Sequence, residues 1–526
     1  MTPSYASSRR AAVAAAVIVA LAAIVPYLPS LDDYFVRDDF GVVQLLSQKP
    51  ASYFPRWFYS SWMDFIWGYT PDEIRPFPAV SYQLTSLGGR GSPVLHHALN
   101  LLLHAANGLL VLAIARTAAA VSLPSATFAA LVFVLLPVQT ESVAWITGRV
   151  DSMPAFFYLA SFLAYVRWRR EGSARWYAAS LAIFFFALFT KQNTITMAAT
   201  IGAYDLLVSR RPLRPAAAFI WPYVPFVALT GGYLWLRYLL FGQVAREGSL
   251  NAQALHDFGV IFARHVTHAV VGDLDGSRTL AAVAVLAVVL VWLLAGRRDP
   301  LKFICFGPLW WAIGIAPVLV AGYSSPRHVY LAAVGWAIAL AIALDDALAI
   351  AGAPRVRRAI AAGSIAVLAW YSVGLVRSVR EWGVIANVSH KAVLDLRGTA
   401  LTLPEGSLVI AGVPRRSWEW ALPYAVRPPF VRTELDHRVF VISPRELSCC
   451  PTQWFAETRQ AIERWSAGGA RDTAVAMRWN PVSGAVLRAE SGETPQLPAL
   501  VRALLDMRQP DELDANLRRI LAELAH

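Results

Sequence analysis

The chain of 526 residues is 56% hydrophobic, carries only 16% charged residues and has a mean hydropathy of +0.46. Soluble proteins of this length are less apolar, so the composition excludes a wholly soluble fold and predicts many membrane spans. The net charge of +12 predicts cytoplasmic loops rich in Lys and Arg, and we do not take it as a sign of nucleic-acid binding.

Apolar runs of spanning length recur as far as about residue 380. The first is expected to be an uncleaved anchor and not a signal peptide, because it reaches about 20 residues. The segment "NAQALHDFGVIFARHVTHAVVG" is too polar to span and predicts an amphipathic surface helix. About eleven spans are predicted, near residues 11–30, 94–115, 125–140, 153–167, 176–190, 194–208, 216–240, 279–296, 301–322, 329–350 and 359–378.

Basic clusters set the predicted orientation. They occur at every second turn of the chain, as "SRR", "RWRR", "SRRPLR", "GRRDPLK" and "PRVRR". By the positive-inside rule these turns and the N-terminus face the cytoplasm. The odd number of spans then places the C-terminus on the other side. We therefore expect a multi-pass protein of the cell inner membrane with a periplasmic C-terminus.

The tail is more polar and has the patterns of a soluble domain. The runs "GSLVIAGV" and "HRVFVISP" predict buried strands, "WNPVSGAVLR" predicts a hairpin, and the last stretch predicts helices with Asp511 as an N-cap. The expected fold class is a polytopic α-helical membrane protein with a small soluble α/β C-terminal domain. The transmembrane domain would occupy residues 1–380, with a long first outer loop at 31–93, and the soluble domain would occupy residues 381–526 on the non-cytoplasmic side.

Four carboxylates follow the first span in "SLDDYFVRDDFGVV". The plain interpretation of Asp38-Asp39 is a helix N-cap with a first-turn acid. The functional interpretation is a catalytic base at the membrane surface. The predicted orientation places further candidate groups on the same face, namely Arg75, Glu141, Arg149, Asp151, Lys191, Arg327 and His328.

Polar side chains also line one face of the second predicted span. His97, Asn100, His104 and Asn107 are spaced by 3, 4 and 3 residues, which places them on one side of a helix. Polar groups inside a span are costly, so they either hydrogen-bond between helices or face a wet cavity. Both interpretations remain open, as does a simple ion pair between Arg149 and Asp151.

Short motifs from about residue 35 to about residue 340 resemble a known family in order and spacing. They include "FVRDDF", "RPFPAVSYQL", "HHALNLLLHAANGLL", "LPVQTESVAWITGRVDSM", "TKQNTITMAATIGAYDLL" and "SPRHVYLAAVG". Together they resemble the membrane half of the transmembrane O-mannosyltransferases that carry tetratricopeptide repeats, and their bacterial relatives. Those enzymes belong to the GT-C superfamily of glycosyltransferases, which use polyprenyl-phosphate sugars.

The resemblance implies roles for individual residues. The acidic pair after the first span matches Asp38-Asp39, and the first of the two, Asp38, is the expected base. Other matched motifs contain Arg75, Lys191 and Arg327, together with the supporting residues His97, Asn100, His104, Glu141, Arg149, Asp151 and Tyr330. The family pattern differs at Leu136, Gln139 and Gln192. A different tail stands where the repeats would follow, which leaves a mannose donor and a protein acceptor open.

The residue types suit transfer from a lipid-linked sugar. A phosphate is a good leaving group, so the reaction needs a carboxylate to take the acceptor proton and cations to hold the phosphate. Asp38 fits the first role, and Arg75, Lys191 and Arg327 fit the second, without a metal or cofactor. The expected partners are membrane lipid, the lipid-linked donor and an acceptor of unknown class, with no nucleic acid. The alternatives are a transporter or flippase of lipid-linked sugars and a non-catalytic membrane assembly protein.

Overall fold

The computed structural model describes most of the chain. Two sequence predictions, the span near 279–296 and the turn at "PVSG", lie outside the described residues. The described residues are 5–64, 71–89, 91–210, 220–244, 252–270, 298–322, 325–412, 419–431, 435, 438–445, 451–468, 472–480 and 485–524.

The chain forms two compact units, which we describe separately. The first unit comprises Met1–Ser30, Ile74–Pro78 and His97–Arg380. The second comprises Leu31–Glu73, Ala79–His96 and Glu381–His526. Much of the stretch predicted as a first outer loop therefore belongs to a folded unit that also contains the C-terminal residues.

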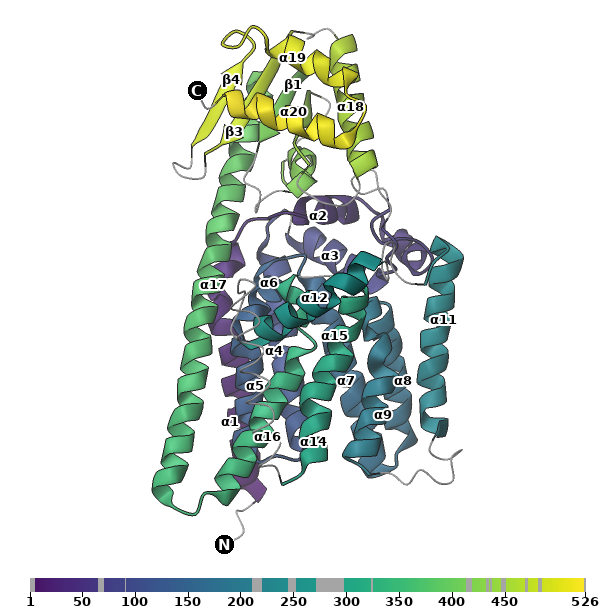
Figure 1. Cartoon of the computed structure of the whole chain (residues 1–526), viewed down its shortest axis with the longest axis vertical. Coiled ribbons are helices and arrows are strands. Elements are labelled where there is room, and N and C mark those ends of the chain that lie inside the picture. The colour runs from purple at the N-terminus through teal and green to yellow at the C-terminus, as the bar shows by residue number, and fades with distance from the viewer. Residues whose placement is uncertain are drawn as a thin grey trace. The chain divides into compact units, whose positions relative to one another are not determined.

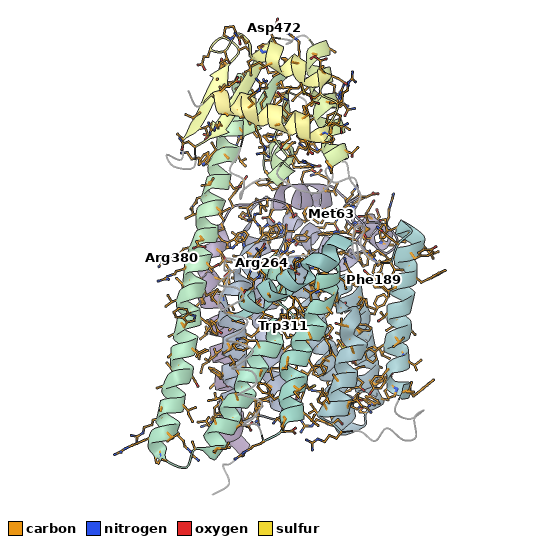
Figure 2. All side chains as sticks on the ribbon, in the orientation of Figure 1. Met63, Phe189, Arg264, Trp311, Arg380 and Asp472 are labelled. Atoms are coloured by element: carbon orange, nitrogen blue, oxygen red, sulfur yellow. The ribbon has the colours of Figure 1, made fainter. Side chains whose placement is uncertain are left out.

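Helices make up the first unit (Figure 1). Within it α7 packs along α8, and α5 packs against both α1 and α16. Helix α12, which carries Arg264, lies against α15, which carries Trp311 (Figure 2). The Phe262 and Trp311 rings meet edge-on there, with centroids 5.1 Å apart. The helices are α1 (Tyr5–Ile24), η1 (Val25–Asp32), α4 (Val94–Thr117), α5 (Leu123–Leu135), η3 (Pro137–Gln139), α6 (Thr140–Ala144), α7 (Arg149–Glu171), α8 (Ala174–Leu188), η4 (Gln192–Thr196), α9 (Met197–Leu207), η5 (Trp221–Tyr223), α11 (Val224–Phe241), α12 (Ala252–Val270), α14 (Pro300–Ile304), η6 (Cys305–Leu309), α15 (Trp310–Val320), η7 (Pro326–Val329) and α16 (Ala333–Ile350), of which η1 ends and α4 begins in the second unit.

Among the described residues, six helices are long and apolar enough to cross a membrane. Two further helices, joined at a bend, would together make a seventh span if they cross as one. This confirms a polytopic helical membrane protein, whereas the predicted number of eleven spans stays a prediction. The bent pair joins α5 to residues 137–144 at an angle of 50°. Leu136 is extended because it precedes Pro137, so the helix ends before the proline.

Helix α17 (Pro354–Thr402) is much longer than the predicted span at 359–378. It begins in the first unit and its residues from Glu381 onward belong to the second. At 1.5 Å per residue its length is about 74 Å, against about 30 Å for the hydrocarbon core of a bilayer. The helix is therefore longer than any membrane span requires.

The second unit contains a four-stranded mixed sheet in the order β2-β1-β3-β4. Strand β1 pairs in parallel with β2 and β3, and β3 pairs antiparallel with β4. The apolar run "LVIAG" in β1 suits a central parallel strand that is buried on both faces. The elements are α2 (Asp39–Ser47), η2 (Ala51–Phe58), α3 (Pro76–Gly89), β1 (Ser407–Gly412), η8 (Glu419–Val426), β2 (Val439–Ile442), α18 (Pro451–Ala467), β3 (Ala474–Trp479), β4 (Val486–Glu490), α19 (Leu497–Ala503), η9 (Leu504–Asp506) and α20 (Pro510–Glu523), of which α3 begins in the first unit.

The predicted strands, hairpin and C-terminal helices are confirmed, but the predicted cap is wrong. Helix α20 begins at Pro510 and its N-cap is Gln509, so Asp511 lies in the first turn. Proline is favoured at the first helical position because it has no N–H to leave unbonded. An acid in the first turn still interacts favourably with the helix dipole, and Asp511 also pairs with Arg445.

Candidate functional site

The acidic pair after the first span lies in the second unit at the start of α2. Asp38 is the N-cap, and its carbonyl accepts the first helical bond from Val42 N–H at 2.9 Å. Asp39 is almost fully buried, and its Oδ2 accepts the N–H of Val36 at 3.0 Å. The Asp38 side chain makes no capping bond to the helix. The two carboxylates thus differ, since Asp39 closes the turn that precedes α2 and Asp38 is half-buried at its tip.

Aromatic packing holds this turn within the second unit. The rings of Phe35, Phe40 and Phe430 contact one another, with centroids 4.8 to 6.3 Å apart. Ser389 of α17 donates a hydrogen bond to the Phe35 carbonyl at 2.5 Å. The start of α2 is therefore fixed by residues distant in sequence, and Asp38 is carried on a rigid support.

The residue before the pair has an unusual backbone. Arg37 has φ of +53°, a left-handed conformation that is uncommon for residues other than glycine. Its guanidinium lies 5.2 Å from the centroid of the Trp382 ring of α17, a cation–π contact.

The first unit brings several predicted residues together around Asp151. Lys191 forms an ion pair with Asp151, and both side chains are buried. Arg327 Nε lies 3.7 Å from Asp151 Oδ2, and His328 Nδ1 lies 3.8 Å from Oδ1. Arg75 is buried and close enough to Lys191 to influence its pKa. Segments from four parts of the sequence therefore come together around the Asp151–Lys191 ion pair.

The electrostatics of this cluster follow from one carboxylate among several cations. Burial raises the pKa of Asp151, but Lys191, His328 and Arg327 outweigh it and hold the pKa well below its usual range. Burial lowers the pKa of Lys191; Asp151 opposes this, while the nearby Arg75 and Arg327 lower it further. Burial and Lys191 lower the pKa of His328 to about 3. Asp151 is thus ionised and His328 neutral near pH 7, and the positive charge beside Asp151 comes from Arg327 and from its ion pair with Lys191.

Local geometry explains how these groups are positioned. Asp151 lies in the first turn of α7, where the helix dipole favours a carboxylate. Gly148 just before it packs so closely on the backbone of Glu141 and Ser142 that a Cβ would clash. Glu141 in turn accepts hydrogen bonds from Ser325 Oγ at 2.9 and 3.0 Å and from Arg327 N–H at 3.3 Å. Glu141 therefore anchors the turn that carries Arg327.

The polar face of α4 divides into two hydrogen-bonded groups. Asn100 Nδ2 donates to the carbonyls of Val143, Trp145 and Ile146 at 2.9 to 3.3 Å. Its Oδ1 accepts from Arg149 Nε at 2.8 Å. Both Asn100 and Arg149 are fully buried. This group fixes the loop between α6 and α7, and hence the position of Asp151.

The second group is deeper along α4. His104 Nε2 lies 3.1 Å from the Val134 carbonyl and Nδ1 lies 2.8 Å from Tyr330 Oη. Because a carbonyl only accepts, Nε2 carries the proton and Tyr330 donates to Nδ1. Asn107 Nδ2 donates to the same Tyr330 oxygen at 3.1 Å. These contacts link α4, α5 and the segment after η7. His104 and Asn107 therefore form hydrogen bonds between helices, as one of the two interpretations predicted. His97 is also buried.

Sequence reasoning missed two contributors to this region. Trp145 lies under Arg327, with its ring centroid 4.6 Å from the guanidinium carbon. Ser325 bonds Glu141 as described. Both residues stand inside quoted motifs, but nothing in their spacing indicates their partners, which are about 180 residues away.

We expect Asp151 and Lys191 to depend on each other for stability. Asp151→Asn leaves Lys191 buried among arginines without its carboxylate and should lower the free energy of unfolding by about 3–5 kcal/mol. Adding Lys191→Met should restore more than half of the loss, because the buried charge is then removed. Denaturation of the purified protein in mixed micelles measures both effects. A double variant as unstable as Asp151→Asn alone would contradict this coupling.

Comparison with known proteins gives both sequence and fold relatives, although no family model matches. The chain is 34% identical over 199 residues to Protein O-mannosyl-transferase Tmtc2 of Drosophila melanogaster, a match that covers 35% of this chain and 21% of the fly protein. It is 29% identical over 219 residues to human Protein O-mannosyl-transferase TMTC4, covering 37% of this chain and 29% of that protein. The matches thus span less than a third of these relatives.

A solved structure agrees with this similarity at the level of the fold. The arabinofuranosyltransferase AftD from Mycobacteria aligns with a TM-score of 0.50 at 16% identity, covering 89% of this chain and 35% of that chain. The chain is therefore similar in sequence to protein O-mannosyl-transferases over about a third of its length, and it has the GT-C-like fold of a multi-pass membrane protein.

Proposed function

We propose that this protein is an integral-membrane glycosyltransferase that moves a sugar from a polyprenyl-phosphate donor to an acceptor hydroxyl. The observation that carries the proposal is a largely buried cluster in which Lys191 and Arg327 lie beside Asp151, and Arg75 lies near Lys191. Three cations in a largely buried site suit a phosphate ester, whose charge grows as the sugar leaves. Charge-assisted bonds from guanidinium and ammonium groups are among the strongest that proteins offer.

The proposed chemistry needs one base and one leaving group. The acceptor oxygen forms a bond to the anomeric carbon of the donor while the bond from that carbon to the phosphate oxygen breaks. The acceptor proton passes to the Asp38 carboxylate, and the released polyprenyl phosphate remains with the cations. Attack from the side opposite the phosphate inverts the anomeric centre. In this proposal, positively charged side chains stabilise the phosphate charge, and no metal or cofactor takes part.

The two acids of "RDDF" receive different roles in this proposal. Asp39 is committed to the Val36 N–H and is buried, which suits a residue that holds the turn. Asp38 is half-buried at the tip of α2, which suits contact with a substrate. Resemblance to the O-mannosyltransferases points to the same member of the pair.

An apolar groove supports a lipid-linked donor. It lies in the first unit between α8 and α11, has a volume of about 710 Å³ and is lined almost entirely by apolar side chains. Leu188 and Phe189 line it, and Lys191 follows two residues after Phe189. A donor whose phosphate is held at Lys191 would therefore find an apolar channel for its tail next to it.

The sugar and the acceptor are narrower proposals. The relatives are named as protein O-mannosyl-transferases, and this favours a hexose, with mannose first. The matched part covers less than a third of those proteins, so their whole activity is not carried over. His97, Asn100, His104, Glu141, Arg149, Asp151 and Tyr330 are proposed to support the site by positioning, as their hydrogen bonds suggest for most of them.

We also propose that the N-terminus is cytoplasmic and that the soluble residues 381–526 are periplasmic, on the side where transfer occurs. The basic clusters of the sequence support this orientation. A reporter enzyme fused after Thr402, where α17 ends, is expected to be active only in the periplasm. Cytoplasmic activity of that fusion would reverse the assignment.

We expect substitutions of Asp38 and Asp39 to affect the rate of sugar transfer differently. Asp38→Asn keeps the size of the side chain and removes the base, so turnover should fall by about 10²- to 10⁴-fold with donor binding retained. Asp39→Asn should cost less, because an amide oxygen still accepts the Val36 N–H. If Asp38→Asn transfers sugar at the wild-type rate, Asp38 is only a helix cap.

Substitutions of two neighbouring glycines of α11 test whether the groove holds the lipid tail of the donor. Gly232 lines the groove and Gly231 does not, while a Cβ added to either meets nothing within 4 Å. Gly232→Leu should raise the KM for a long-chain polyprenyl-phosphate sugar by about tenfold, equivalent to ~1.4 kcal/mol. A donor with a short tail should be unaffected. Gly231→Leu is the matched control, and equal behaviour of the two variants would remove the groove from the donor site.

A further inference from the structure

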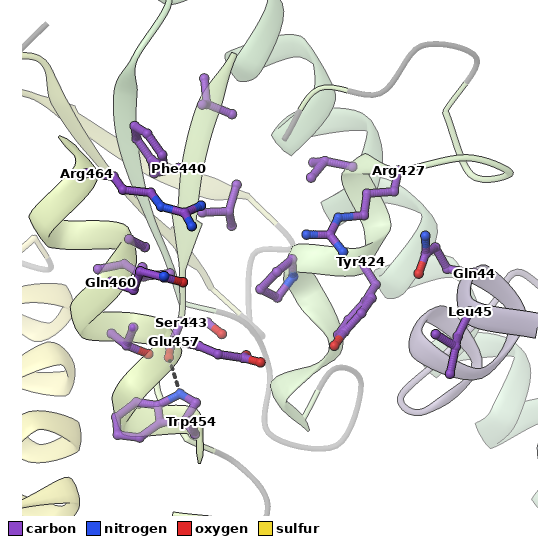
Figure 3. Close-up of a pocket in the computed structure, with 17 residues that line it drawn as sticks. Gln44, Leu45, Tyr424, Arg427, Phe440, Ser443, Trp454, Glu457, Gln460 and Arg464 are labelled. Carbon is purple, nitrogen blue, oxygen red and sulfur yellow. Dashed lines mark hydrogen bonds between the residues drawn. The ribbon is translucent and has the colours of Figure 1, made fainter. Parts of the chain in front are cut away.

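A pocket in the second unit has no part in the chemistry described so far. Its volume is about 370 Å³, within the range of about 300–1,000 Å³ of pockets that hold small ligands. Residues of α2, η8, β2 and α18 line it (Figure 3). All four elements belong to the second unit, so the pocket is formed within one compact body.

The walls of the pocket present polar side chains toward one another. Helix α18 contributes Glu457, Gln460 and Arg464, and Arg427 and Tyr424 come from the opposite wall (Figure 3). Burial raises the pKa of Glu457, and the nearby Arg427 partly opposes the rise. Because both side chains line the pocket, a carboxyl group and a guanidinium face the same space.

Between the walls the pocket follows the edge of the sheet. Five consecutive residues, 439–443, line it. Successive side chains of a strand point to opposite faces, so five in a row can border one cavity only along the strand edge. Strand β2 is the outer strand of the sheet, and its edge borders the pocket. The apolar groups of Leu45 and Phe440 complete the lining.

This mixture of groups narrows the chemistry of a ligand. A simple anion would leave the Glu457 carboxyl and the Gln460 amide without partners, and a simple cation would be repelled by Arg427 and Arg464. An apolar ligand would strip water from charged groups without replacing its hydrogen bonds. Hydroxyl groups both donate and accept, so a molecule rich in them satisfies guanidinium, carboxylate and amide partners together. Its C–H faces would lie on the apolar lining.

We propose that this pocket binds a saccharide, and that the saccharide is part of the acceptor of the transfer reaction. The second half of this inference rests on the proposed function, whereas the binding itself does not. Gln44 and Leu45 of α2 line the pocket, and Asp38 caps the same helix. Six residues of helix correspond to about 9 Å along its axis. A saccharide seated in the pocket is thus held on the element that carries the proposed base.

Direct binding to the full chain in nanodiscs tests the first half. The probes are fluorescent oligomers of glucose, mannose, galactose and N-acetylglucosamine, with a Ser/Thr-rich peptide and inorganic phosphate as other classes. We expect at least one oligosaccharide to bind, and Arg464→Ala and Ala461→Leu each to weaken it by about tenfold or more. Ala461→Leu fills the pocket without removing a charge.

The matched control is Glu463→Ala, on the same helix α18. Glu463 is exposed, lies 3.8 Å from the half-buried Arg459 one helical turn away, and does not line the pocket. This variant should bind saccharide like the wild type. If no oligosaccharide binds, or if all three variants bind alike, the saccharide site is refuted. Peptide binding that is lost in Arg464→Ala and Ala461→Leu would assign the pocket to a peptide instead.

The second half is tested by kinetics with the saccharide that binds. Both pocket variants should raise the KM for this acceptor by about tenfold with little change in kcat or in the KM for donor. Saccharide binding without any transfer would refute the proposed function and leave the pocket as a saccharide site. Transfer to a different acceptor, with a KM unchanged in both variants, would refute the acceptor role.

Discussion

The buried carboxylate of Asp151 is the constraint on which the membrane unit depends. A carboxylate taken out of water must be paired, because the cost of burying an isolated ion is several kcal/mol. Lys191 provides the direct partner, and Arg327 and Arg75 are close by. Each comes from a different turn between helices. Those turns must therefore lie in one place, and the helices that flank them are brought together as a consequence.

The remaining polar contacts of the unit serve this arrangement. Asn100 holds the three carbonyls that precede α7, Gly148 allows the two adjoining segments to touch, and Glu141 fixes the turn of Arg327. The His104–Tyr330 bond joins α4 to the chain just after that same turn. Each of these residues therefore helps to position the cluster around Asp151, even where it would not touch a substrate. In the proposed reaction this cluster of cations would stabilise the charge that grows on the departing phosphate.

Much of the architecture could be predicted from the sequence because its signals are local. Apolar runs, basic clusters and the strand patterns "GSLVIAGV" and "HRVFVISP" are each read within one segment. The resemblance to known transferases likewise depends on short motifs in order.

The hydrogen-bond and ion-pair partners of individual side chains could not be predicted, because they depend on packing between distant segments. Arg149 and Asp151 are two residues apart and suggested an ion pair, yet Arg149 bonds Asn100 and Asp151 bonds Lys191. The pocket of the second unit was missed for the same reason, since its walls come from four separate stretches. Asp511 was misplaced because Pro510 occupies the first helical position and makes Gln509 the N-cap, two residues before the predicted one.

Whether the protein consumes a polyprenyl-phosphate sugar can be decided by measuring donor turnover. The purified protein in nanodiscs is incubated with a panel of synthetic polyprenyl-phosphate sugars and a mixture of acceptors, and the lipid products are followed by mass spectrometry. The account predicts that one donor is converted to free polyprenyl phosphate while its sugar appears on an acceptor with inverted anomeric configuration. If no donor is consumed, and the same protein instead moves intact lipid-linked sugars across sealed vesicles, the account is wrong and the protein is a transporter.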